Sequence, residues 1–146
     1  MGDRRQAREL ALQALFFLDT DTFDPAKGDE ERIRRNVDAF CINNEARITP
    51  EVEPFFRQLI TGVIDNQTRI DHLLSTYSKN WKLSRMPKVD RNIMRIATYE
   101  FLECPDIPES ATINEAAEIG KKYGTRDSGP FINGVLDRIR TLESSN

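Results

Sequence analysis

Three arginines stand close together near the start of the chain, at Arg4, Arg5 and Arg8. Guanidinium groups bind phosphates through paired hydrogen bonds and stack on nucleobases, so this cluster suits RNA recognition. The alternative is an ordinary solvated helix end. A helix dipole favours acids rather than bases at the N-terminus, and this mismatch mildly favours a binding role.

A second group of cations and aromatic rings lies near the C-terminus. Lys121, Lys122 and Tyr123 come just before a glycine, and Asp127 and Phe131 follow it. An aromatic ring beside two lysines can stack on a base while the ammonium groups meet phosphates, which indicates a single-stranded RNA surface. Two alternatives stay open, because Phe131 could belong to the core margin and Asp127 could simply cap the last helix.

The chain shows no evident arrangement for catalysis or metal binding. Glu100 falls on a buried stripe, where a carboxylate must find hydrogen-bond donors or shift its pKa. No second acid, histidine or nucleophile is paired with it, so we expect it to accept backbone N–H groups from a nearby loop or helix start. The only histidine, His72, has no Cys or His cluster around it, and Cys41 and Cys104 form no metal motif. We therefore expect a protein that is not an enzyme and has no cofactor and no metal site.

The first predicted helix carries apolar residues on two faces. Its main stripe includes Ala7, and Phe16 falls about 180° away with Leu12 beside it. One interpretation is a helix that packs on both sides. The other is an exposed apolar patch for a protein partner.

Another helix is predicted from Pro87 to Leu102, with Val89, Ile93 and Ile96 on its buried stripe. Arg95 projects almost opposite this stripe. We therefore expect its guanidinium to be open to solvent, to an acid or to a phosphate.

These side chains must be positioned by helices, because the hydrophobic periodicity is helical nearly everywhere. The expected helices cover residues 3–18, 30–43, 49 to a bend near 66, onward to 77, 87–102, 111–123, and 128 or 130 to 142. Trp81 and Leu83 lie in a connector, and the polar stretch 19–29 is the expected place for mobility. Gly124 is expected to end its helix in the left-handed conformation. The pattern predicts an all-α bundle of about seven helices.

The composition is that of a folded protein with a mild negative charge. A length of 146 residues suits one domain, and the formal net charge is -3. This balance argues against indiscriminate binding of nucleic acid through overall charge, but it allows a local basic patch. There is no apolar run of about 18 residues and no secretory signal, so we expect a cytoplasmic protein with no membrane contact.

Several segments resemble the NusB family, bacterial transcription antitermination factors that bind RNA. In the C-terminal third these are DRNIMRIATYEF, INEAAEIGKKYG and FINGVLDRI. Upstream, RRQARELALQALF resembles the family's arginine-rich start, and LITGVIDNQTRIDHLL resembles its middle segment. The likeness covers essentially the whole chain. A NusB-like domain also begins some RNA methyltransferases, but this chain ends where their catalytic domain would start, so we expect the freestanding factor.

The resemblance implies an all-α fold of about seven helices in two packed small helical bundles. They form a single RNA-binding domain, with sub-bundles at about 1–78 and 79–146. It also implies binding to the boxA element of nascent ribosomal RNA transcripts as a heterodimer with Nus factor E, a small-subunit ribosomal protein. This complex joins the elongating RNA polymerase and suppresses premature termination. The mechanism would be assembly, without covalent chemistry.

The resemblance also assigns roles to individual residues. The RNA-facing positions would be Arg4, Arg5, Arg8, Tyr77, Arg95, Lys122, Tyr123, Asp127 and Phe131. Phe16 and Asp90 would contact Nus factor E, with Leu12 on the same apolar face as Phe16. Asp90 would offer its carboxylate to that basic protein. Phe16 stands where a tyrosine can occur, and so lacks a hydroxyl that could bond the partner.

A competing hypothesis is a helical protein–protein adaptor without specific RNA binding, which would use the Leu12–Phe16 face. Some NusB-like proteins self-associate through the RNA-binding face. The sequence leaves monomer and homodimer open for this chain, as it does any separate role of residues 19–45.

Overall fold

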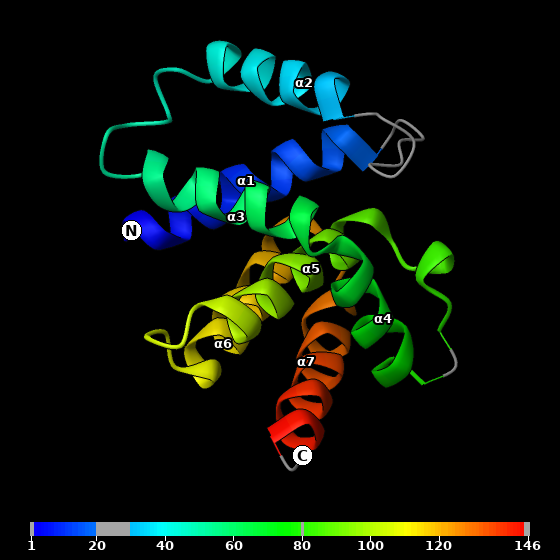
Figure 1. Cartoon of the computed structure of the whole chain (residues 1–146). Coiled ribbons are helices and arrows are strands. Elements are labelled where there is room, and N and C mark those ends of the chain that lie inside the picture. Colours follow the sequence, from blue (N-terminus) through cyan, green and yellow to red (C-terminus); the bar gives the residue numbers. More distant parts are fainter. Residues whose placement is uncertain (1, 20–29, 80, 145–146) are drawn as a thin grey trace. The chain divides into compact units, whose positions relative to one another are not determined.

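The structure, a computed structural model, describes residues 2–19, 30–79 and 81–144, and all regular structure among them is helical (Figure 1). The helices are α1 (Asp3–Asp19), α2 (Glu30–Asn43), α3 (Glu53–Asp65), α4 (Gln67–Tyr77), the short 3₁₀ turn η2 (Leu83–Arg85), α5 (Lys88–Glu103), α6 (Glu109–Tyr123) and α7 (Ser128–Ser144). The predicted all-α class is confirmed. The expected mobile stretch at 19–29 lies almost wholly outside the described residues.

The chain divides into two compact units, residues 1–64 and 65–146. The sequence led us to expect this division near residue 78. It falls earlier because α4 packs on α5 and α7, and so belongs with the second unit. That the two units act as a single RNA-binding domain stays a prediction.

The first unit is built from α1, α2 and α3. The predicted apolar stripe of α1 is buried, and α2 packs against α1. The Phe40 ring of α2 stacks on the Phe56 ring of α3, with centroids 5.9 Å apart and planes 23° apart. α3 begins at Glu53 rather than at Thr49. The Thr49 carbonyl first accepts the N–H groups of Val52 and Glu53 in a turn, at 3.0 and 2.9 Å.

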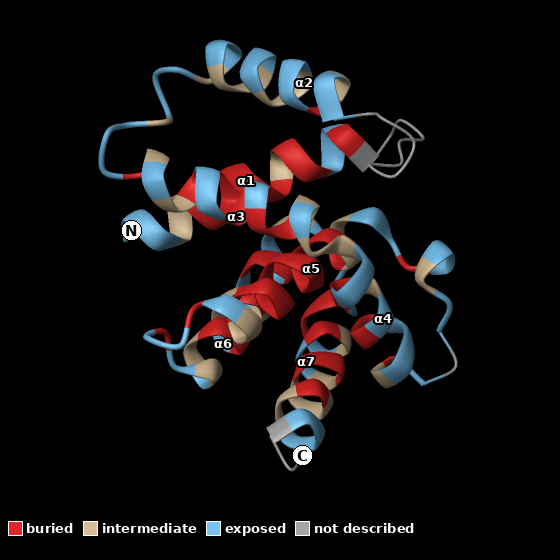
Figure 2. Ribbon diagram, in the orientation of Figure 1, coloured by how far each residue is buried: buried red, intermediate tan, exposed pale blue. Residues whose placement is uncertain are grey.

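The second unit is organised around α5. This helix packs against α4, α6 and α7, and it is buried at Asp90 and continuously from Asn92 to Glu100 (Figure 2). A helix covered on three sides has little solvent-facing surface, so the single buried stripe predicted for it was wrong. Val89, expected in the core, is only half-buried.

The last two helices close this unit, and α7 contributes an apolar face to its core. α6 packs along α7, and α7 buries Ile132, Val135, Leu136 and Ile139. Among the described residues, no helix combines the length and apolarity needed to cross a membrane.

Candidate nucleic-acid interface

The turn between α6 and α7 carries most of the predicted RNA-facing residues of the second unit. The Gly124 N–H donates to the Gly120 carbonyl at 2.8 Å, and the Thr125 N–H donates to Ser128 Oγ at 2.9 Å. Gly124 has φ −98°, so the expected left-handed cap was wrong. Glycine is required here for space instead. A Cβ at this position would lie 2.3 Å from Ser128 Oγ and 2.9 Å from the Gly120 carbonyl oxygen.

The side chains around this turn are partly open to solvent. Lys122 and Asp127 are exposed and Tyr123 is half-buried. Lys122 Nζ lies 5.2 Å from the centroid of the Tyr123 ring, within the range of a cation–π contact. The turn therefore presents an ammonium group and an aromatic ring side by side, as the sequence predicted.

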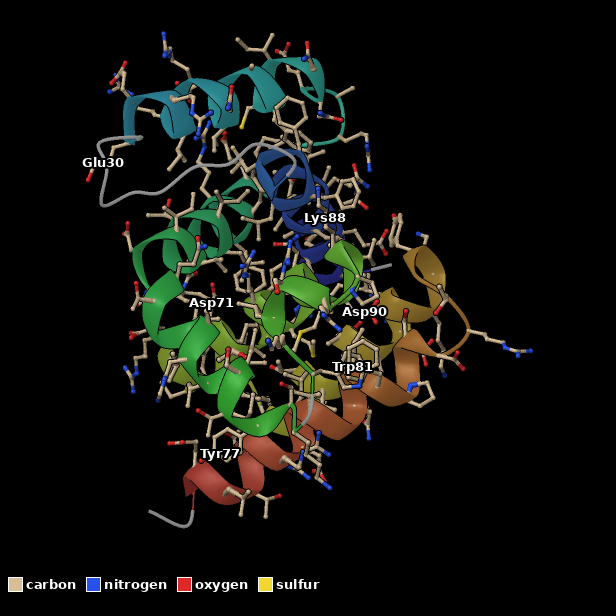
Figure 3. All side chains as sticks on the ribbon, turned by 90° about the vertical axis from the view of Figure 1, so that its right-hand side faces the viewer. Glu30, Asp71, Tyr77, Trp81, Lys88 and Asp90 are labelled. Atoms are coloured by element: carbon tan, nitrogen blue, oxygen red, sulfur yellow. The ribbon has the colours of Figure 1, made fainter. Side chains whose placement is uncertain are left out.

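Phe131 is half-buried in the first turn of α7, and it has a neighbour that sequence analysis missed. Its ring centroid lies 5.6 Å from that of Trp81, with the planes tilted by 59°. Trp81, labelled in Figure 3, is the chain's only tryptophan, and it is 50% exposed. The available signal was a lone tryptophan followed by a lysine in a connector rich in cations.

Tyr77, at the end of α4, is hydrogen-bonded to α7 through its hydroxyl and through its backbone carbonyl. Its hydroxyl donates to Glu143 Oε1 at 2.7 Å, and its carbonyl accepts from Arg138 Nε at 2.7 Å. The hydrogen bond to Glu143 raises the pKa of Tyr77. Its predicted contact with RNA stays a prediction.

Arg95 does not face solvent as expected. It is 8% exposed, and its Nε and Nη2 donate to the two carboxylate oxygens of Asp71 at 2.9 and 3.1 Å. Its Nη1 donates to Asn92 Oδ1 at 3.1 Å. This bidentate ion pair between Arg95 and Asp71 joins α5 to α4. Asp71 is labelled in Figure 3. Of the three expected ligands the structure shows the acid, and the phosphate contact stays a prediction.

Asp90 is buried rather than presented to a partner. It accepts a hydrogen bond from the Ser128 hydroxyl at 2.8 Å, which joins the start of α5 to the start of α7. Burial raises the pKa of Asp90, and the Ser128 bond opposes this only in part. The carboxylate supports the α6–α7 turn from within the unit, and its predicted contact with a partner stays a prediction.

The Asp90–Ser128 pair gives a pH-dependent prediction. Because the folded-state pKa is raised, ionised Asp90 costs stability, and this cost grows as pH rises through the unfolded and then the folded pKa. Asp90→Asn keeps an acceptor for Ser128 and removes the charge, so it should unfold at the same or higher temperature than the parent at pH 7. This advantage should vanish below about pH 4, near the unfolded pKa.

Asp90→Ala is the matched variant, because it also removes the charge but leaves the buried Ser128 hydroxyl without this acceptor. It should lose about 1–3 kcal/mol. Thermal melts at pH 3.5, 5 and 7 measure both variants. Equal destabilisation by Asn and Ala at neutral pH would contradict the assigned cost of the charge.

Glu100 is buried and accepts a hydrogen bond from the Thr112 hydroxyl at 2.9 Å. Thr112 lies in the first turn of α6, so the predicted position at a helix start is confirmed. The donor of this bond is a side-chain hydroxyl, and the expected bonds from backbone N–H groups stay a prediction. Among the described residues, no cluster of three or more His, Cys, Asp or Glu side chains could hold a metal ion.

In the first unit, two of the three clustered arginines lie over an aromatic ring of α3. The guanidinium carbons of Arg4 and Arg8 lie 6.0 and 5.5 Å from the Phe55 ring centroid. Arg4 is exposed and Arg5 half-buried, but Arg8 is buried. The alternative of a solvated helix end therefore fails for Arg8.

The apolar patch predicted on α1 is only partly present. Phe16 is 40% exposed, but Leu12 is buried, so the expected Leu12–Phe16 surface was wrong for Leu12. Phe17, which sequence analysis had not singled out, is 53% exposed. On α1, the large apolar side chains that are exposed are these two consecutive phenylalanines.

Comparison with known proteins places the chain in a family. Residues 5–141 match the NusB family. The transcription antitermination protein NusB of Desulforapulum autotrophicum is 54% identical over 144 residues, which cover 99% of this chain and 95% of that protein.

Solved structures agree in fold. T. maritima NusB superposes with a TM-score of 0.79 at 38% identity, covering 94% of this chain and 90% of that one. A crystal structure of the antitermination factors NusB and NusE in complex with double-stranded RNA superposes with a TM-score of 0.76. At 22% identity, over 97% of this chain and 98% of that one, it supports the fold. With this extent of similarity in sequence and in structure, the chain belongs to the NusB family.

Proposed function

We propose that this protein is a cytoplasmic transcription antitermination factor that binds boxA RNA of nascent ribosomal RNA transcripts. The observation that carries the proposal is the 54% identity, over nearly its whole length, to a protein described as a transcription antitermination protein. The contact of the exposed Lys122 with the half-buried Tyr123 ring supports it, because an ammonium group beside a ring suits a phosphate beside a base.

The partner in this proposal is Nus factor E, bound as a heterodimer that joins the elongating RNA polymerase. A protein of the same fold has been crystallised with NusE and double-stranded RNA. The exposed Phe16 on α1 is a suitable anchor for a protein partner. The chain's part is to hold RNA and protein together, so the proposal assigns it no catalytic step.

The arginines at the start of α1 provide the test. Replacing Arg4 and Arg5 together with alanine should weaken binding of a boxA strand, because two phosphate contacts are lost. The slope of log affinity against log salt should fall by about 1.4, at ~0.7 per contact for a single strand. Titration of labelled RNA at several salt concentrations, with and without Nus factor E, measures both effects.

The matched control is the double replacement of Arg34 and Arg57 with alanine. Arg34 and Arg57 are exposed in the first unit, and each pairs with a glutamate of its own helix, at 2.7 and 3.1 Å. The control removes the same charge and should keep the parent salt slope. If both doubles behave alike, overall charge rather than a site explains binding. If the unmodified protein does not prefer boxA RNA over a scrambled strand, the proposal is contradicted.

The second candidate is the helical adaptor without specific RNA binding. The exposed Phe16 and Phe17 favour it, because consecutive exposed phenylalanines suit a protein contact. In that case Phe16→Ala weakens partner binding while the Arg4 and Arg5 double replacement changes nothing. Measuring partner binding by Phe16→Ala and RNA binding by the Arg4 and Arg5 double variant therefore separates the two functions.

A further inference from the structure

The connector between α4 and α5, taken with the first residue of α5, is a basic segment in an acidic chain. Residues 79–88 contain four cations and no acid, although the whole chain has a formal net charge of -3. All four side chains are exposed: Lys79, Lys82, Arg85 and Lys88. Exposed cations with no acid among them in the sequence make a local site for a polyanion.

The connector is held in place at both ends. The Ser78 hydroxyl donates to the Trp81 carbonyl at 2.8 Å, and Ser78 itself is buried. Lys79 adopts φ 57°, in the left-handed region. Farther along, Arg91 Nη1 donates to the Leu83 carbonyl at 3.0 Å, and Met86 is buried. The indole is therefore presented from an anchored backbone.

Trp81 leaves half of its surface exposed on this anchored segment. Its contact with Phe131 is tilted rather than stacked, at 5.6 Å and 59°. Exposing so large an apolar ring loses the free energy that burial would contribute. A half-exposed ring beside a second ring, flanked by lysine, matches the stacking elements that hold successive bases of a single strand.

We propose that Trp81 is a second base-stacking residue, which extends the RNA surface from Phe131 to the exposed cations Lys79 and Lys82. One base of a single strand stacks on the indole, and the neighbouring phosphates meet Lys79 and Lys82. The inference rests on the proposed function and names a further contact for the same RNA. The charges favour RNA over a basic partner protein, which would meet like charge along this connector.

The experiment uses Trp81 as its own reporter, since it is the only tryptophan. The full chain is titrated with a 12-nucleotide single-stranded boxA RNA, with and without Nus factor E. Tryptophan fluorescence and the anisotropy of an end label on the RNA are followed together. Stacking on the indole should quench its emission with the same midpoint as the anisotropy change. The Trp81→Phe protein serves as the fluorescence blank.

Affinity of variants gives an independent readout. Trp81→Ala should weaken RNA binding by roughly 5- to 150-fold, the range for losing one stacked base, while Trp81→Phe should keep most of the affinity. The matched control is Leu142→Ala, which removes an apolar side chain of similar exposure, 47%, from the same unit. It should bind RNA as the parent does. Thermal melts show that each variant is folded.

The outcomes separate the inference from the function on which it rests. RNA binding with unchanged fluorescence and a normal Trp81→Ala affinity overturns the inference and leaves the proposed function standing. Equal quenching by a heparin fragment, a polyanion without bases, also overturns stacking. Quenching by Nus factor E alone, with none by RNA, makes Trp81 a protein contact and overturns the inference. If the anisotropy shows no RNA binding, the proposed function fails and the inference with it.

Discussion

Arg95→Ala should lower the free energy of unfolding by about 3 kcal/mol, because it leaves a largely buried carboxylate without its cation. The Asp71 side chain is 21% exposed and accepts two hydrogen bonds from the Arg95 guanidinium. A loss of this size lowers the melting temperature by roughly 10 °C for a chain of this length. Thermal and urea unfolding measure it. A change below about 1 kcal/mol would contradict a structural pair.

The matched variant replaces both partners, Arg95 and Asp71, with leucine. Apolar side chains at both positions avoid the uncompensated charge, so the double variant should be more stable than Arg95→Ala. Its RNA affinity then tests the role carried over from the family resemblance. A stable double variant with parent affinity gives Arg95 a purely structural role. A stable variant with a clear loss supports a direct contact with phosphate.

Gly124→Ala is the second replacement with a large expected effect. The new Cβ would meet Ser128 Oγ and the Gly120 carbonyl oxygen, and the latter belongs to the α6 backbone and cannot simply rotate away. Overpacking of this kind costs about 1–3 kcal/mol. The turn must also shift, which moves Tyr123 and Asp127 relative to Phe131. We therefore expect RNA affinity to fall in protein that is still folded, as judged by melting and anisotropy.

Gly134→Ala is the matched control for this replacement. Gly134 lies within α7, and the nearest atom to an added Cβ is Arg138 Nη1 at 3.8 Å, an ordinary contact. Alanine in a helix interior should add up to about 1 kcal/mol of stability. RNA affinity should stay at the parent value. Parent-like stability and affinity in Gly124→Ala would show that the turn tolerates a side chain.

The helices could be predicted from sequence because their signals are local. The expected helix at 30–43 agrees with α2, Glu30–Asn43, and the expected bend near residue 66 separates α3 from α4. Apolar spacing and helix-ending residues act over a few positions, so the chain alone specifies them. The cation-and-aromatic cluster around Lys122 and Tyr123 was also readable, because its members lie close together in sequence.

The burial of individual residues was harder to predict from the sequence than the helices were, since burial depends on which elements pack together. Periodicity predicted one buried face for α5, but three helices cover it, so Asp90 and Arg95 became internal partners of Ser128 and Asp71. The indole of Trp81 contacts the ring of Phe131, although the two residues are 50 positions apart in the sequence. The sequence by itself determined the helices, the family and the residue types available for binding RNA. Only tertiary packing decided which of those charges are neutralised inside the protein and which rings are brought together, because these contacts join residues with no local relation.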